Sequence, residues 1–203
     1  MKAALKKLLN NNRLIWRGEK CAATGRGVPT GHAALDAMLP EAGWLRGALI
    51  EVIVPRWGIG ELQLFLPAMA AITQANKQLA WIAPPYIPYP PALANGGILL
   101  RHLLVLHPPR HQDIPWAMET VLRQRRCAMV LAWPGQLLPK TVRRLQLAAE
   151  AGGGLGVLFQ SAHRDSSFAA TRLRLTPSTT GLQVTLLKSR ATRDRQTVTI
   201  ALD

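Results

Sequence analysis

Hydrophobic residues follow two patterns, which alternate from about residue 30 to residue 160. Short continuous apolar runs bounded by glycine or proline predict buried strands, and these occupy residues 48–54, 79–83, 103–106, 128–133 and 155–159. Apolar residues at helical spacing predict helices over residues 33–39, 60–75, 114–125 and 138–151. The third of these helices is expected to turn three side chains toward the core, those of Trp116, Val121 and Leu122. Buried strands that alternate with helices predict an α/β fold, with a mostly parallel sheet flanked by helices.

Proline residues change what we expect in two segments of the chain. Pro67 lies within the second helical pattern, so that helix either kinks there or begins later. Prolines crowd residues 84–91, which we expect to be extended and without regular structure. A short helix is expected to follow over residues 92–95.

The two ends of the chain have different patterns. Apolar residues recur every second position near the C-terminus, which predicts an antiparallel hairpin with its turn at 176–181 and an edge strand over 197–202. Residues 2–9 have the pattern of a short basic amphipathic helix. We therefore divide the chain into a basic N-terminal helix and linker (1–24), an α/β core (25–187) and a basic C-terminal segment with the edge strand (188–203).

Composition narrows the choice of partners. The chain has 203 residues, with 25 Lys and Arg against 11 Asp and Glu, so its formal net charge is +14. This excess favours nucleic acid or an acidic protein as a partner. Cys21 and Cys127 lie far apart, which excludes a disulfide framework and a cysteine zinc site, and no metal site is expected. No apolar run approaches the roughly 18 residues that a membrane span requires, so we expect a cytoplasmic protein without membrane contact.

The turn after the first predicted strand is where an α/β protein binds phosphate. A phosphate-binding loop of the form G-x-x-x-x-G-K-[ST] holds phosphates with its lysine and magnesium with its hydroxyl. Here the two glycine positions are Pro55 and Gly60, the lysine position is Glu61 and the hydroxyl position is Leu62. A carboxylate at the lysine position repels a triphosphate, so we expect no tight nucleotide binding.

The residues before this turn resemble the entry to the ATPase core of the RecA family. They read TGHAALDAML over 30–39 and GWLRGALIEV over 43–52. The resemblance implies a RecA-like core of the P-loop NTPase type. It also implies that the catalytic glutamate position is Pro85, that the magnesium-associated aspartate position is Ala132, and that the nucleotide-sensing glutamine is kept as Gln160. We therefore expect a degenerate nucleotide site, no cofactor and no catalysis.

Longer stretches resemble the ImuA family, RecA-like accessory proteins of SOS-induced mutagenesis in bacteria. The most specific are WIAPPYIPY at 81–89 and LQLAAE at 145–150, and the similarity runs from about residue 15 to residue 190. The resemblance implies a scaffold for error-prone translesion DNA synthesis, associated with the nucleoid. Its implied partners are ImuB, RecA, the α subunit of an error-prone polymerase, and DNA. RecA relatives range from monomers to filaments, so self-association into a homo-oligomer stays an alternative.

Other candidate residues fall into two groups. Tyr86 and Tyr89 either contact a protein partner or belong to a connection packed over the empty nucleotide site. Trp57 either joins such a surface or fills the space that a nucleotide would occupy. Sequence-independent contacts with DNA phosphates are expected from basic residues near the two ends and in one loop: Lys2, Lys6, Lys7, Arg164, Lys188, Arg190, Arg193 and Arg195.

Two further functions stay open. The SulA family of cell-division inhibitors shares a degenerate RecA-like architecture and a related proline–tyrosine block, and it binds the division GTPase. A DNA-stimulated ATPase is the third possibility.

Overall fold

A single eight-stranded sheet organises the part of the chain that the computed structural model describes, residues 27–161, 167–189 and 195–202. Its strand order is β3-β2-β4-β5-β1-β6-β7-β8. The strands are β1 (Ala48–Ile53), β2 (Gln78–Ile82), β3 (Leu103–Leu106), β4 (Cys127–Ala132), β5 (Leu155–Gln160), β6 (Thr171–Ser178), β7 (Gly181–Lys188) and β8 (Gln196–Ile200). The helices are α2 (Ala33–Met38), α3 (Leu66–Gln74), α4 (Pro90–Asn95), α5 (Ile114–Leu122) and α6 (Pro139–Gly152), with short 3-10 turns at Leu100–His102 and His111–Asp113.

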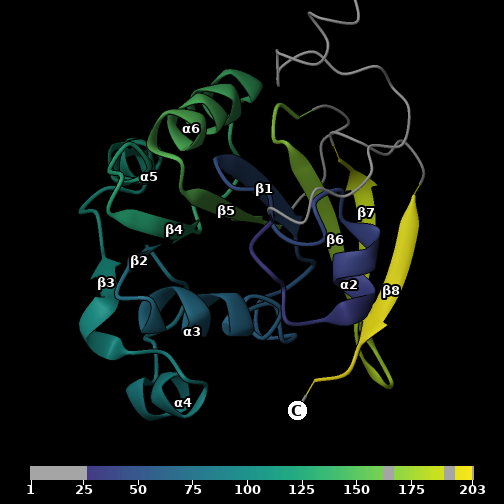
Figure 1. Cartoon of the computed structure of the whole chain (residues 1–203). Helices are drawn as coiled ribbons and strands as arrows, with labels where there is room; N and C mark the ends of the chain where they lie inside the picture. The colour runs from purple at the N-terminus through teal and green to yellow at the C-terminus, as the bar shows by residue number, and fades with distance from the viewer. Residues whose placement is uncertain (1–26, 162–166, 190–194, 203) are drawn as a thin grey trace, which may run out of the picture.

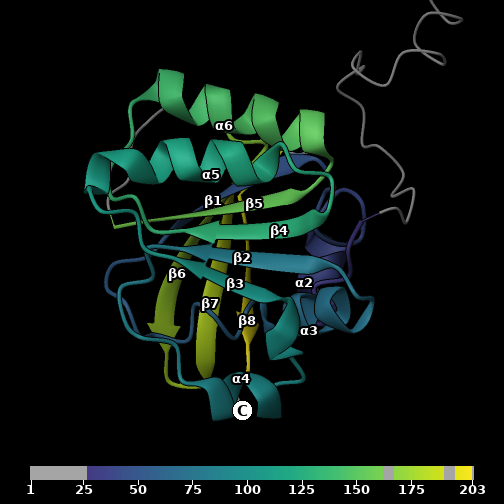
Figure 2. The ribbon, with the colours of Figure 1, turned by 90° about the vertical axis from the view of Figure 1, so that its left-hand side faces the viewer.

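Strand β1 is central, because it pairs in parallel with β5 on one side and with β6 on the other. Parallel pairing continues from β5 through β4 and β2 to β3. Strands β7 and β8 add an antiparallel hairpin and an edge strand beyond β6. The sheet twists so strongly that β6, β7 and β8 run across the direction of β2 and β4 (Figure 2). The predicted mixed α/β fold, mostly parallel with antiparallel C-terminal strands, is confirmed.

Helices cover the two faces of the sheet separately. Helices α5 and α6 lie on one face, and α2 and α3 lie on the other (Figure 1). All six residues of β1 are buried, as expected for a strand that is covered on both faces. Within the described residues, no helix is both long enough and apolar enough to cross a bilayer.

Three local predictions need correction. Helix α4 begins at Pro90, although we expected residues 84–91 to be irregular throughout; proline fits the first turn of a helix because its missing N–H has no helical partner there. Trp116 is 66% exposed rather than inward, since the buried stripe of α5 runs through Ile114, Met118 and Leu122. The hairpin strands extend to Ser178 and Gly181, so its turn is shorter than predicted.

The open alternative for Pro67 is also decided. Helix α3 begins at Leu66, which places Pro67 in its first turn and leaves the residues before it as short turns. At the C-terminal end of α6, Gly153 has a φ of 76°, the left-handed conformation that the glycine run predicted for the end of this helix.

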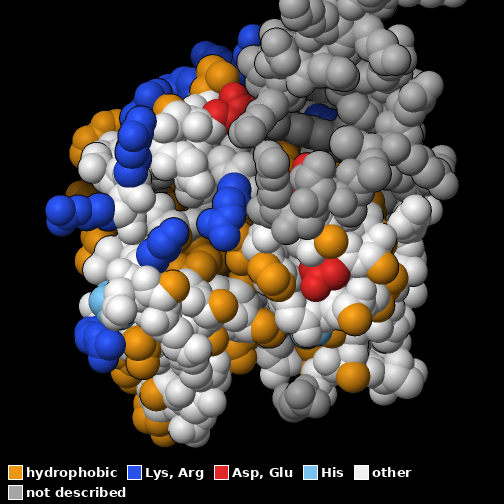
Figure 3. Space-filling view, in the orientation of Figure 1, with side chains coloured by type: hydrophobic (Ala, Val, Ile, Leu, Met, Phe, Trp, Pro, Cys, Tyr) orange, Lys and Arg blue, Asp and Glu red, His pale blue; other side chains and the backbone are white. Residues whose placement is uncertain are grey.

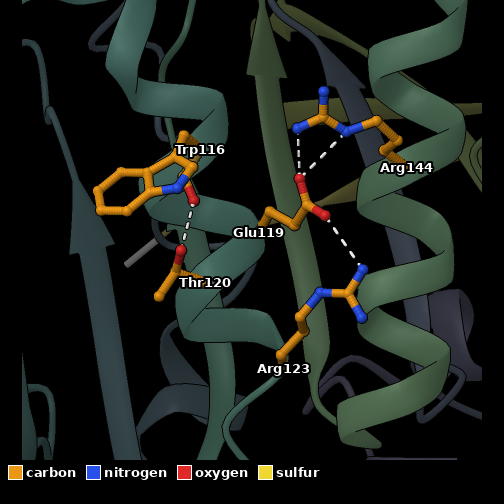
Figure 4. A network of polar contacts seen from close by, with 5 residues as sticks. All are labelled: Trp116, Glu119, Thr120, Arg123 and Arg144. Carbon is orange, nitrogen blue, oxygen red and sulfur yellow. Dashed lines mark hydrogen bonds and ion pairs between the residues drawn. The ribbon is translucent and has the colours of Figure 1, made fainter.

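Helices α5 and α6 are joined on their outer surface by one carboxylate. Glu119 of α5 accepts a hydrogen bond from Arg123 at 3.1 Å and bonds from Arg144 of α6, including one from its Nε at 3.1 Å (Figure 4). The hydrogen bond from Arg144 holds the pKa of Glu119 below its usual value. Exposed pairs of this kind contribute about 0–1 kcal/mol each, so the network orients the two helices more than it stabilises them.

The junction between the parallel strands and the C-terminal hairpin contains a buried ion pair. Arg172 of β6 lies beside Glu51 of β1, and its Nε donates to the Glu51 carboxylate at 2.7 Å. Both side chains are less than 5% exposed. Nearby, the Gln146 side-chain oxygen accepts hydrogen bonds from the N–H groups of Leu49 and Ala170, both at 3.0 Å, which ties α6 to the same junction.

Replacing Arg172 by Ala is expected to lower the free energy of unfolding by about 3–5 kcal/mol, because the Glu51 carboxylate is left buried without its partner. The double replacement of Glu51 and Arg172 by Met removes both charges and is expected to recover most of that loss. Urea denaturation measures both variants. An equal loss in the single and double variants would show that the pair does not act through its charges.

Candidate functional site

The parallel strands bring the predicted nucleotide-site residues to one edge of the sheet. Because β1, β2, β4 and β5 all run in the same direction, their carboxyl ends lie together, and we call this the carboxyl edge. The turn after β1 meets the ends of the other strands there. Four predicted positions follow or end these strands: Glu61, Pro85, Ala132 and Gln160.

Glu61 occupies the anion position of the turn itself. Its carboxylate accepts hydrogen bonds from the backbone N–H of Gly58, at 3.0 and 3.1 Å to its two oxygens, and from the N–H of Ile59 at 3.0 Å. The side chain is only 5% exposed. Successive N–H groups that converge in this way form a nest for an anion. A phosphate entering the turn would have to displace a carboxylate that is part of the same loop.

The backbone of the turn depends on its glycines. Gly58 and Gly60 have φ values of 83° and 95°, which other residues rarely adopt. A Cβ on Gly60 would lie 2.4 Å from a methyl carbon of Leu202, so the end of the chain packs directly against the turn. Trp57 and Leu62 pack against the main hydrophobic core. Of the two interpretations of Trp57, this contact favours the one in which it fills space within the fold.

Aromatic side chains form a continuous stack below the turn. Phe159 of β5 stacks on Trp133 with ring centroids 4.9 Å apart, and Phe65 meets the edge of Phe159 at 5.8 Å. Trp44 and Trp81 extend the stack at its two ends. Offset and edge-to-face pairs each add about 0.5–1.5 kcal/mol beyond their burial. Trp57, Ile59 and Leu62 of the turn pack against the apolar cluster that contains these rings.

The remaining positions supply no groups for nucleotide chemistry. Ala132 is fully buried and carries no carboxylate. Pro85 is exposed, just beyond the end of β2. Gln160 is 1% exposed, and neither side-chain amide atom has a hydrogen-bond partner among the residues that the structure describes. Among the described residues no three His, Cys, Asp or Glu side chains are grouped so that they could hold a metal ion.

The structure places the predicted partner-binding and DNA-binding residues in different parts of the molecule. Tyr86 and Tyr89 are both 68% exposed, and Ile87 between them is 92% exposed. The segment therefore projects from the carboxyl edge instead of packing over the turn. Lys188 donates a hydrogen bond to the backbone oxygen of Ser167 at 2.7 Å, and Arg195 is exposed before β8. The other predicted DNA contacts lie outside the described residues: Lys2, Lys6, Lys7, Arg164, Arg190 and Arg193.

Two contacts at this site were not foreseen from the sequence. The sequence identifies Glu61 only as a repulsive substitute for lysine, whereas in the structure its carboxylate accepts a hydrogen bond from the N–H of Gly58, three residues earlier. A glutamate that follows two glycines in a Gly-Ile-Gly-Glu run, at the start of a helical pattern, is the local signal in the sequence. The contact of Leu202 with Gly60 joins residues far apart in the chain, and no local pattern predicts it.

Replacing Glu61 by Ala is expected to lower the free energy of unfolding by about 1–3 kcal/mol, because N–H groups in the turn lose their acceptor. Inorganic phosphate is then expected to raise the melting temperature of the variant more than that of the wild type, since a free anion can enter the empty nest. Sodium chloride at the same ionic strength is the control. Equal phosphate effects on the two proteins would contradict the assignment.

Replacing Gln160 by Met is expected to raise the free energy of unfolding by about 1–3 kcal/mol, because it removes a buried amide that lacks partners and keeps a similar volume. Guanidinium denaturation of the variant and the wild type gives the difference. A loss of stability would show that the amide is satisfied in the folded protein.

Similarity to known proteins is found at the level of solved structures. No protein-family model matches the chain, and no curated protein matches it. Among solved structures, the crystal structure of SulA from Pseudomonas aeruginosa is similar, with 21% sequence identity and a TM-score of 0.47. The match covers 56% of this chain and 98% of the SulA chain. At this level of similarity it assigns neither a family nor a function.

Proposed function

We propose that this chain is a non-catalytic accessory protein that supports error-prone translesion DNA synthesis by holding protein partners and DNA. The partners that the sequence resemblance implies are ImuB, RecA and the α subunit of an error-prone polymerase. The observation that carries the non-catalytic part is the Glu61 carboxylate, which is bonded to the N–H groups of Gly58 and Ile59.

Catalysis would need groups that the carboxyl edge does not provide. Hydrolysis of a nucleoside triphosphate requires a cation near the phosphates and an oxygen ligand for magnesium. Leu62 stands at the position of the hydroxyl ligand, and Ala132 at that of the magnesium-associated carboxylate. Loss of both functions, together with an anion already in the turn, favours a binding role for the fold.

The projecting segment after β2 supports a protein partner. Tyr86, Ile87 and Tyr89 present three large side chains to solvent within four residues, and prolines on either side limit their freedom. Aromatic groups held in a stiff segment provide contact area at low entropic cost, as in the anchors of protein interfaces. Trp116 is 66% exposed near the start of α5 and adds another aromatic side chain to the outer surface.

Replacing Tyr86 and Tyr89 together by Ala is expected to leave the free energy of unfolding within about 0.5 kcal/mol of the wild type, because both side chains are exposed. Recovery of the protein partner from cells with induced DNA damage is expected to fall sharply, as a loss of at least about 2 kcal/mol at an interface anchor would cause. Leu138, just before α6, and Leu147 on α6 are 54% and 51% exposed, and their joint replacement by Ala is the matched control.

The identity of the recovered protein decides between the functions. ImuB or RecA supports the proposal, whereas the division GTPase would support the SulA-like alternative. Deleting the protein is expected to reduce damage-induced mutation without slowing ordinary growth. Phosphate release from magnesium-ATP, with or without DNA, would contradict the non-catalytic assignment.

A further inference from the structure

Basic side chains collect at the amino edge of the sheet, the edge opposite the nucleotide-type turn. A cation lies just before each of four parallel strands: Arg46 before β1, Lys77 before β2, Arg101 before β3, and Arg125 with Arg126 before β4. We call these five residues the basic row. They are separated by up to 80 positions in the sequence, and only the parallel strand order brings them to one edge.

The row is exposed and not neutralised. All five side chains are exposed. None of them takes part in the ion pairs found among the described residues, which involve Arg110, Arg123, Arg144 and Arg172. Arg123 and Arg144, on the neighbouring helices, are turned toward Glu119 instead (Figure 4).

Two hollows open between these cations. One, of about 200 Å³, is lined by Arg46, Lys77 and Arg125 around an apolar floor that includes Ala128 and Leu155. The second, of about 440 Å³, is lined by Arg101 and Arg126 and by apolar residues on the α5 side of the sheet, whereas the first lies on the α3 side; Cys127 lines both. Neither has an Asp or Glu among its described lining residues. Figure 3 looks onto this edge and shows Lys and Arg side chains around an apolar depression.

The spacing of the row suits a single nucleic-acid strand. Neighbouring strands of a sheet lie about 4.8 Å apart, so the five strands from β3 to β1 span about 19 Å. A stacked strand carries a phosphate about every 3.4 Å, and the row therefore faces about five or six phosphates. At the entry to β5 the row has glycines, Gly153 and Gly154, in place of a cation, which leaves the smaller hollow open between Lys77 and Arg46.

Helix dipoles give these residues a second, structural role. Helices α3, α5 and α6 run opposite to the strands that they connect, so their C-termini lie at the amino edge. Cations near a helix C-terminus are favoured by the macrodipole. That role also applies to Arg46, because the adjacent Gly47 lies against the C-terminal residues of α6, whereas Arg101 follows no long helix.

We propose that the basic row binds the phosphates of single-stranded nucleic acid independently of sequence, with unpaired bases or sugars entering the apolar hollows. The inference rests on the proposed function for DNA as a partner, and it places that contact on the edge opposite Tyr86 and Tyr89. Protein and nucleic acid are thus bound on opposite edges of one sheet. The row replaces the C-terminal basic residues as the main DNA contact.

The test compares two variants that each lose four positive charges. One replaces Arg46, Lys77, Arg125 and Arg126 by Gln, and the matched control replaces Lys188, Arg190, Arg193 and Arg195 by Gln. Binding of a fluorescent oligo-dT is measured by anisotropy over a series of salt concentrations, and thermal melting confirms that each variant is folded. The double replacement of Lys77 and Arg125 by Gln is the milder version if the fourfold variant melts early.

The row variant is expected to bind about tenfold or more weakly at low salt, and its log–log salt slope is expected to be shallower by about two to three, at roughly 0.7 per phosphate contact. The control is expected to keep most of the wild-type slope. The salt slope of the Lys77 and Arg125 double variant is expected to be shallower than that of the wild type by about one unit or slightly more.

Several results would overturn the inference: no binding by the wild type, equal losses in the two fourfold variants, or an unchanged slope in the row variant. Equal affinity for a duplex of the same length, or tighter binding of poly-glutamate than of oligo-dT, would also overturn it. Partner recovery is a separate measurement. If the protein still recovers ImuB or RecA but does not bind oligo-dT, this inference fails and the protein-binding part of the proposed function stands, whereas binding of oligo-dT without recovery of either protein contradicts the proposed function and leaves this inference standing.

Discussion

The parallel pairing of β1 with β5 and β6 is the constraint on which the rest of the molecule depends. A strand paired on both edges and covered on both faces must be apolar, and every residue of β1 is buried. The exception to that apolar character is Glu51, which is tolerated because Arg172 lies beside it on β6. The same pair holds the C-terminal hairpin against the parallel strands.

Parallel strands also give the sheet two chemically different edges. Residues that follow the strands meet at the carboxyl edge, where the nucleotide-type turn, the aromatic stack and the projecting tyrosines lie. Residues that precede the strands meet at the amino edge, where the exposed cations of the basic row lie. The surfaces that we propose for protein and for nucleic acid therefore lie at opposite edges of one sheet.

The turn after β1 has the backbone of an anion site, and the Glu61 carboxylate occupies that site. Gly58 and Gly60 still allow the positive φ angles that make N–H groups converge, and Glu61 supplies the anion from within the chain. An internal carboxylate has an entropic advantage over a free phosphate because it is already held next to the turn. The Glu61 carboxylate therefore satisfies N–H groups of the turn, and Leu202 packs against the turn at Gly60.

The amino-acid sequence by itself determined the alternation of strands and helices and the missing lysine, hydroxyl and carboxylate groups, because each depends on local periodicity or on residue type at a known position. It also determined the positive charge of the chain. The prediction that Trp116 faces inward was wrong because Trp116 shares its side of α5 with Glu119 and Thr120, whereas the residues at helical spacing from Ile114 form the apolar stripe that packs against the sheet. Only the tertiary structure decided that Leu202 packs against Gly60 and which cations share an edge. These features depend on strand order and direction, which bring together residues that no local pattern connects.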